Sequence, residues 1–152
     1  MNRHCFISKS TEVNASVSTV FGVLSDIEHW NEWTKSVTKI SYLPNNNFLI
    51  GGKALVHQPK LPASVWTITE IIPNRFFFWQ MNSHGVKITA KHIMKETDKG
   101  TFIEHQVIYE GLFAWLVYKL TAKLTKQYLG MEITGLKHHC EEINQDRLVT
   151  AE

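Results

Sequence analysis

The sequence has little of what marks several classes of protein. It contains two cysteines in 152 residues, Cys5 and Cys140, and so few, so far apart, exclude a disulfide framework and a zinc ribbon. No stretch approaches the roughly 18 apolar residues of a membrane span, so we expect no stable membrane insertion. The first residues lack the apolar core of a signal peptide. These absences predict a cytoplasmic protein with reduced thiols.

Charge of one sign is also lacking. The chain has 16 Lys and Arg against 14 Asp and Glu, a formal net charge of +2, and this balance gives no reason to expect a nucleic-acid partner. There is no phosphate-binding loop and no set of nucleophile, base and orienting group. The sequence therefore requires neither catalysis nor a cofactor. The length predicts a single domain over residues 1–152.

Aromatic residues, by contrast, are abundant. They make up 11% of the chain, with five Trp and eight Phe. Each such side chain buries about 150–250 Å². The excess predicts either an aromatic core or the lining of an apolar cavity.

The order of secondary-structure elements follows from hydrophobic periodicity and turn residues. A strand at 5–13 precedes a short helix capped by the segment Asn14-Ala15-Ser16 and a second short helix at 27–33 capped by Asp26. Strands then follow at 37–42, 54–57, 65–72, 76–81, 86–94 and 102–109, and one long helix runs from 112 to about 143. Short connections favour an antiparallel meander. We expect an α+β fold in which about seven strands curve around the long helix.

Three short motifs carry a resemblance to a known family. They are VFGVLSD at 20–26 followed by Trp33, GTFIEH at 100–105 ahead of Gly111, and Leu136-Lys137 followed by Glu141. Together they resemble the START-like or SRPBCC superfamily, with the polyketide cyclase/dehydrase branch as the nearest match. The resemblance implies a helix-grip fold with an internal apolar cavity, and it implies no particular activity. The tyrosine-proline motif of the quinone-binding relatives is replaced by EHWNEW at 28–33, which argues against a quinone ligand.

The last hairpin holds the most specific candidates. A two-residue turn at Asp98-Lys99 would place His92 directly opposite His105, on the inward face with Ile88, Tyr109 and other apolar residues. The pair could be buried histidines satisfied by neighbours, could hydrogen-bond the polar end of a ligand, or could act as acid and base. Two histidines lack the further ligands of a zinc site, so we expect no metal.

The long helix carries two apolar stripes. The first is Phe113, Val117, Leu120, Leu124, Tyr128 and Met131, and the second is Leu129, Ile133, Leu136, Cys140 and Ile143. The offset between them predicts that the two halves of the helix face different surroundings. Gly130 and Gly135 lie where the stripes exchange, and they permit either a close helix approach or room for a ligand.

These elements predict a cavity of about 300–1,000 Å³ between sheet and helix. The candidate ligand-binding residues are His92, His105, Tyr109, Ile88, Met94, Val107, Trp66, Phe78, Val117, Leu120, Leu124, Tyr128 and Met131. The sequence does not decide which face of the strand at 76–79 points inward.

The segment at 112–118 is apolar on all sides, and three interpretations stay open for it. It could lie at the cavity mouth, form a homodimer interface, or touch a membrane. Lys119, Lys123 and Lys126 would suit anionic lipid or simply a solvated face.

The leading functional hypothesis is the binding or transport of a small hydrophobic molecule, such as a lipid, a polyketide or an aromatic compound. The alternative is a polyketide cyclase or dehydratase that uses His92 and His105. A third hypothesis is a module that binds a partner through the start of the long helix.

Overall fold

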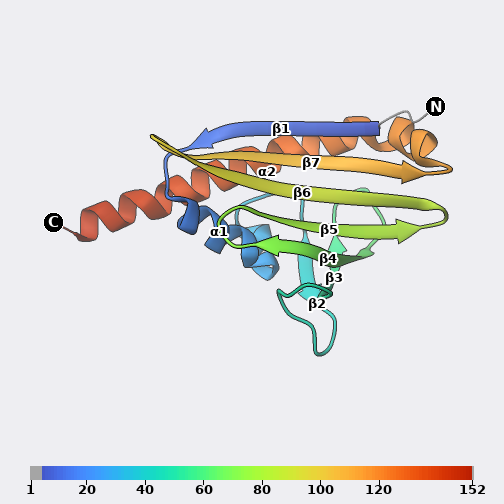
Figure 1. The fold of residues 1–152 in the computed structure, drawn as a ribbon, viewed down its shortest axis with the longest axis horizontal. Helices are drawn as coiled ribbons and strands as arrows, with labels where there is room; N and C mark the ends of the chain where they lie inside the picture. The colour runs from blue at the N-terminus through green and yellow to red at the C-terminus, as the bar shows by residue number, and fades with distance from the viewer. Residues whose placement is uncertain (1–4, 152) are drawn as a thin grey trace.

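The computed structural model describes residues 5–151. Seven strands form one antiparallel sheet in the order β1-β7-β6-β5-β4-β3-β2, and a long helix crosses one face of it (Figure 1). The elements are β1 (Cys5–Val13), α1 (Val17–Ser25), η1 (Ile27–Glu32), β2 (Lys39–Tyr42), β3 (Lys53–His57), β4 (Ser64–Ile72), β5 (Phe76–Ser83), β6 (Val86–Thr97), β7 (Gly100–Gly111) and α2 (Ala114–Thr150). This is the helix-grip, START-like fold that the sequence predicts.

The chain reaches this topology through one long connection. Strands β2 to β7 follow each other as hairpins, whereas β1 pairs with β7 at the far edge of the sheet. The segment with α1 and η1 carries the chain from one edge to the other. As a result α2 contacts β1, β7 and β6 on its way across the sheet, and α1 beyond them.

The register of the last hairpin is as predicted. His92 pairs with His105, Ile88 with Tyr109 and Met94 with Ile103. The predicted cap of α1 is also confirmed, because the Ser16 hydroxyl accepts a 3.2 Å hydrogen bond from the Thr19 amide.

Two features of the helices differ from the predicted ones. The second short element is a 3-10 helix. Asp26 occupies its N-cap position as predicted, but its side chain makes no capping hydrogen bond and lies 2.8 Å from Nδ1 of His29. Helix α2 extends to Thr150, beyond the predicted end near 143. No proline or glycine stops it there, and Arg147 donates a 2.9 Å hydrogen bond to Thr19 that holds the added turns against α1.

One half of the molecule is packed solid, and we call it the closed half. Here α2 contributes Leu136 and Cys140, both with no exposed surface, to a buried apolar cluster that also contains Leu24 of α1. A Cβ atom on Gly135 would lie 1.9 Å from the Trp33 carbonyl oxygen, so only glycine allows this approach of helix to loop. Burial raises the pKa of the Cys140 thiol to about 12. Apolar burial and this close approach thus join α2 to α1 and to the loop after η1 in the closed half.

Candidate functional site

The other half of the molecule, which we call the open half, contains a cavity of about 850 Å³ between the sheet and the first half of α2. This volume lies inside the predicted range. Most of the side chains in the wall are apolar and come from β4, β5, β6, β7 and α2.

The cavity opens at one end of the molecule. The lining residues that are exposed to solvent include Pro62 and Ala63 in the β3–β4 loop, Ser83 and His84 in the β5–β6 turn, and Phe113 before α2. These three segments lie together at the end of the sheet opposite α1 (Figure 1). We call this opening the mouth.

Seven of the predicted site residues line the cavity. They are Ile88, His92, Val107, Tyr109, Trp66, Val117 and Tyr128. The hairpin register accounts for four of them, since alternation along β6 and β7 points every second side chain inward.

Phe78 is not in the wall, which corrects its predicted placement. It lies on the outer face of the sheet, where its ring stacks on Phe76 at 4.6 Å and the Lys91 ammonium lies 4.9 Å from its centroid. Strand alternation instead turns Phe77 and Trp79 inward.

The first predicted stripe of α2 is also corrected. Leu120 is 76% exposed, Met131 is 42% exposed, and the half-buried Leu124 does not line the cavity. The stripe repeats every 3.6 residues on average and so keeps to one arc of the helix, but the arc that faces the cavity lies to one side of it. The cavity-facing positions are held by Thr121 and Thr125.

The threonines face the sheet because Tyr109 provides a partner for them. The Tyr109 hydroxyl lies 2.8 Å from the Thr125 hydroxyl and 3.2 Å from that of Thr121. Near the mouth, the Tyr128 hydroxyl donates to the Pro59 carbonyl in the β3–β4 loop. These contacts connect the open half of α2 to the sheet through polar groups.

Met94 and His105, the remaining candidates, are buried without lining the cavity. Met94 is 3% exposed in the core, and His105 has no exposed surface. His105 lies directly beside His92, with ring centroids 4.6 Å apart and planes at 85°.

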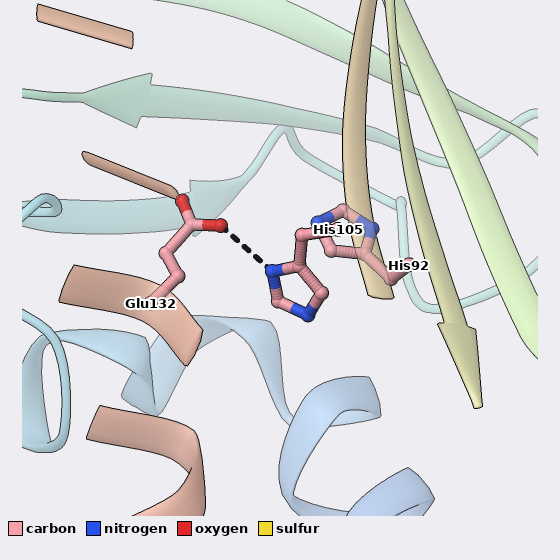
Figure 2. A group of neighbouring side chains, drawn as sticks. All are labelled: His92, His105 and Glu132. Carbon is pink, nitrogen blue, oxygen red and sulfur yellow. Dashed lines mark hydrogen bonds and ion pairs between the residues drawn. The ribbon is translucent and has the colours of Figure 1, made fainter. Parts of the chain in front are cut away.

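A buried carboxylate completes the histidine pair (Figure 2). Glu132 on α2 lies in the cavity wall, and its Oε2 is 3.0 Å from Nδ1 of His105. The Ser36 hydroxyl donates to the other oxygen at 3.4 Å, and Ser36 in turn lies 2.9 Å from the Thr34 hydroxyl. Glu132 is not among the predicted site residues. The one available signal was an acidic residue beside Ile133 and Leu136 on a buried stripe.

The surroundings of His92 keep it neutral. Its ring stacks on Phe77 at 4.3 Å and meets Trp30 edge-on at 5.2 Å. Burial, and then the neighbouring His105, lower the pKa of His92 well below 6.5, while a hydrogen bond to the Phe77 backbone acts in the opposite direction.

Two ring nitrogens of the pair have no hydrogen-bond partner among the described residues: Nδ1 of His92 and Nε2 of His105. A carboxylate can only accept a hydrogen bond, so the contact with Glu132 places a proton of His105 on Nδ1. The cluster thus contains an oriented imidazole next to a second, neutral one, a set that can accept or donate hydrogen bonds or move a proton.

In the described part of the chain, His92, His105 and Glu132 form the group of side chains that could hold a metal ion. One ligand atom from each of them lies within 4.8 Å of those of the other two. Two imidazoles and a carboxylate suit zinc or iron. Each ligand atom would have to lie about 2.0–2.2 Å from the ion. The direct hydrogen bond between His105 and Glu132 would have to open to admit one, so the observed geometry is that of a hydrogen-bonded cluster.

Solved structures show the same fold. Hypothetical protein jhp0584 from Helicobacter pylori superposes with a TM-score of 0.73 at 14% identity, over 89% of this chain and 87% of that one. A START superfamily protein from Mycobacterium smegmatis gives 0.68 at 18% identity, over 90% and 98%. The Zhui aromatase/cyclase from Streptomyces sp. R1128 gives 0.72 at 12% identity, over 90% and 93%.

The comparison with curated proteins finds no match. None of the helices within residues 5–151 has an apolar stretch of the length that a membrane span requires.

The match to a family model identifies the family. The family model described as polyketide cyclase/dehydrase and lipid transport matches residues 4–141. With this match over most of its length, the chain belongs to the family described as polyketide cyclase/dehydrase and lipid transport, and it has the START-like fold.

Proposed function

We propose that the protein binds a small hydrophobic molecule in its cavity, in order to carry or deliver it. The observation that supports this most is the cavity of about 850 Å³ with a mostly apolar wall. Empty space costs about 24 cal/mol per Å³ in a protein core. A sealed, dry cavity of this size would cost on the order of 20 kcal/mol, more than the whole stability of an ordinary domain. Apolar walls favour filling such a space with an apolar molecule over filling it with water.

The polar groups in the wall suggest how the ligand is oriented. His92 and Glu132 lie beside the closed half, and Tyr109 with its threonines lies along one side. The ligand we propose has an apolar body, as in a lipid, a polyketide or an aromatic compound. It carries a hydroxyl or carbonyl group that reaches His92.

The proposed setting is the cytoplasm. Both cysteines are buried and free, which suits a reducing compartment. The partner in this proposal is the small molecule, and nucleic acid has no part in it.

Two measurements test the binding function. Native mass spectrometry of the purified protein should show a co-purifying hydrophobic molecule. In addition, Ala90→Phe, which fills the cavity, should weaken the binding of the fluorescent fatty acid cis-parinaric acid at least about tenfold. Thr89→Phe is the matched control, since it places the same ring on the opposite face of β6. Equal binding by both variants would contradict the proposal.

A second function, acid–base catalysis as in a cyclase or dehydratase, is favoured by one observation. Glu132 accepts a hydrogen bond from Nδ1 of His105, and this bond fixes the orientation of the imidazole, as a general base requires. His105→Gln or Glu132→Gln should then reduce turnover of a poly-β-ketone substrate by about 10²–10⁴-fold with ligand affinity nearly intact. If the cluster only binds, the wild type shows no turnover, and either variant changes affinity alone.

A further inference from the structure

The start of α2 and the turn before it expose an unusual number of large apolar side chains. Five of them occur within nine residues: Leu112 is 79% exposed, Phe113 50%, Trp115 48%, Leu116 43% and Leu120 76%. We call this set the apolar patch. Single exposed apolar residues are ordinary, whereas a contiguous group marks a surface that is covered in use.

The apolar patch is continuous with the mouth of the cavity. Phe113 belongs to the patch and also lines the cavity, as does Val117 one turn further along. A Cβ atom on Gly85 would lie 3.6 Å from the Phe113 ring, so the patch begins against the β5–β6 turn. Whatever covers the patch therefore also faces the mouth.

Positive charge follows the apolar patch along the helix. Lys119, Lys123 and Lys126 come next, and no Asp or Glu occurs between Glu110 and Glu132. None of the three takes part in an ion pair within the described residues. At about 100° per residue the three lysines share one narrow arc of the helix, next to Leu116 and Leu120.

This pattern fits a lipid surface. Interfacial helices place Trp and Leu at the boundary of headgroups and acyl chains, with Lys beside them toward anionic phosphates. The Lys119 ammonium lies 5.5 Å from the Trp115 ring centroid, so charge and aromatic ring occupy neighbouring positions.

A second copy of the chain fits the same surface less well. A twofold interface brings a patch against itself. The row of lysines would then face its own copy with no carboxylate between Glu110 and Glu132 to compensate, and like charges in contact oppose association.

We propose that residues 112–126 dock the protein onto an anionic membrane, with the apolar patch at the acyl boundary and the three lysines on lipid phosphates. Docking of this kind places the mouth against the bilayer. The inference concerns the surface alone and holds whether or not the cavity takes the ligand proposed above.

Co-sedimentation with vesicles tests the docking. Wild type should bind vesicles of phosphatidylcholine and phosphatidylglycerol in equal amounts, and bind vesicles of phosphatidylcholine alone much less. Replacing Lys119, Lys123 and Lys126 together by Gln should lower the partition coefficient on the order of 100-fold, since each lysine near an anionic surface contributes about 1 kcal/mol. The double variant Leu116→Ser/Leu120→Ser should lower it at least about tenfold.

The control is Leu148→Ser/Val149→Ser, which removes two exposed apolar side chains at the other end of the same helix and should bind like wild type. Ala90→Phe should also bind vesicles normally, which separates docking from ligand binding. Failure of wild type to bind the mixed vesicles would overturn the proposal. So would a Leu116→Ser/Leu120→Ser variant that keeps its vesicle binding and instead halves its mass in solution.

Discussion

The two halves of α2 meet the same sheet in opposite ways. From Ile133 to Cys140 the helix buries Ile133, Leu136 and Cys140 in the core. From Val117 to Glu132 it turns two threonines, Tyr128 and Glu132 toward the cavity that lies between it and the sheet. Both halves are regular helix and both face the sheet. The difference therefore comes from side chains and not from a change of secondary structure.

The two halves differ in how helix α2 is joined to the rest of the fold. In the closed half, helix and loop approach until only Gly135 fits beside the Trp33 carbonyl. In the open half, Tyr109 reaches across to Thr121 and Thr125 and keeps helix and strand connected over a gap. In the closed half, helix and loop are joined by apolar packing. In the open half, helix and strand are joined by hydrogen bonds between side chains.

The largest expected effect comes from removing a leucine in the closed half. Leu136→Ala should lower the free energy of unfolding by about 2–5 kcal/mol, because the fully buried side chain leaves a void. Leu120→Ala removes the same atoms from an exposed site on the same helix and should change it by less than about 0.5 kcal/mol. Urea denaturation of both variants measures the contrast, and equal losses would mean that the two halves are packed alike.

A pair of glycines provides the next test. Gly135→Ala should cost about 1–3 kcal/mol, because the new methyl group would meet the Trp33 carbonyl oxygen at 1.9 Å. Gly130→Ala places a methyl group where nothing lies within 4 Å, so helix propensity should stabilise the protein by up to about 1 kcal/mol. Thermal unfolding of the two variants should shift in opposite directions. Stabilisation by Gly135→Ala would contradict the close approach.

The pH dependence of stability tests the histidine that lies between the halves. The pKa of His92 is lowered in the folded protein, so its stabilising contribution is present above an unfolded pKa of about 6.5 and is lost as the pH falls below that value. Between about pH 7.5 and pH 5.5 this group should account for a loss of about 1.4 kcal/mol. His92→Gln should show a correspondingly flatter profile, and an unchanged profile would mean that His92 takes up its proton while folded.

The smallest effect is expected from the hydrogen bond between Tyr109 and Thr125 in the open half. Tyr109→Phe removes the hydroxyl that reaches Thr125 at 2.8 Å and should cost about 0.5–1.5 kcal/mol. Thr125→Val should cost a similar amount, and the double variant should cost less than the sum of the two. Additive losses in this cycle, measured by urea denaturation, would show that the two hydroxyls do not depend on each other.

The strands could be predicted because their signals are local. Alternation and turn residues locate β6 and β7, and the two-residue turn at Asp98-Lys99 sets the pairing of His92 with His105. The second stripe of α2 was likewise correct for Leu136 and Cys140, since direct packing selects apolar residues. Where burial alone determines a residue, the sequence is informative.

The open half was harder to predict for a physical reason. The wall of the cavity there is built from threonines that pair with Tyr109, and hydrophobic periodicity does not detect them. The exposed Leu120 belongs to a surface and not to the core, so periodicity assigned it to the wrong face. Glu132 is in place only because His105 and Ser36 converge on it from distant segments, and no local pattern contains such a contact.

Each half of the molecule contains one cysteine that a thiol reagent could modify. Cys5 pairs in register with Tyr109 beside the cavity, and Cys140 lies in the closed half with its thiol held protonated by burial. A thiol reagent can modify either only when the surrounding structure opens, so its rate at each site reports the local free energy of opening. If the open half is the more mobile one, Cys5 will be alkylated under native conditions at a rate well above that of Cys140. A hydrophobic molecule that fills the cavity should slow the labelling of Cys5 alone.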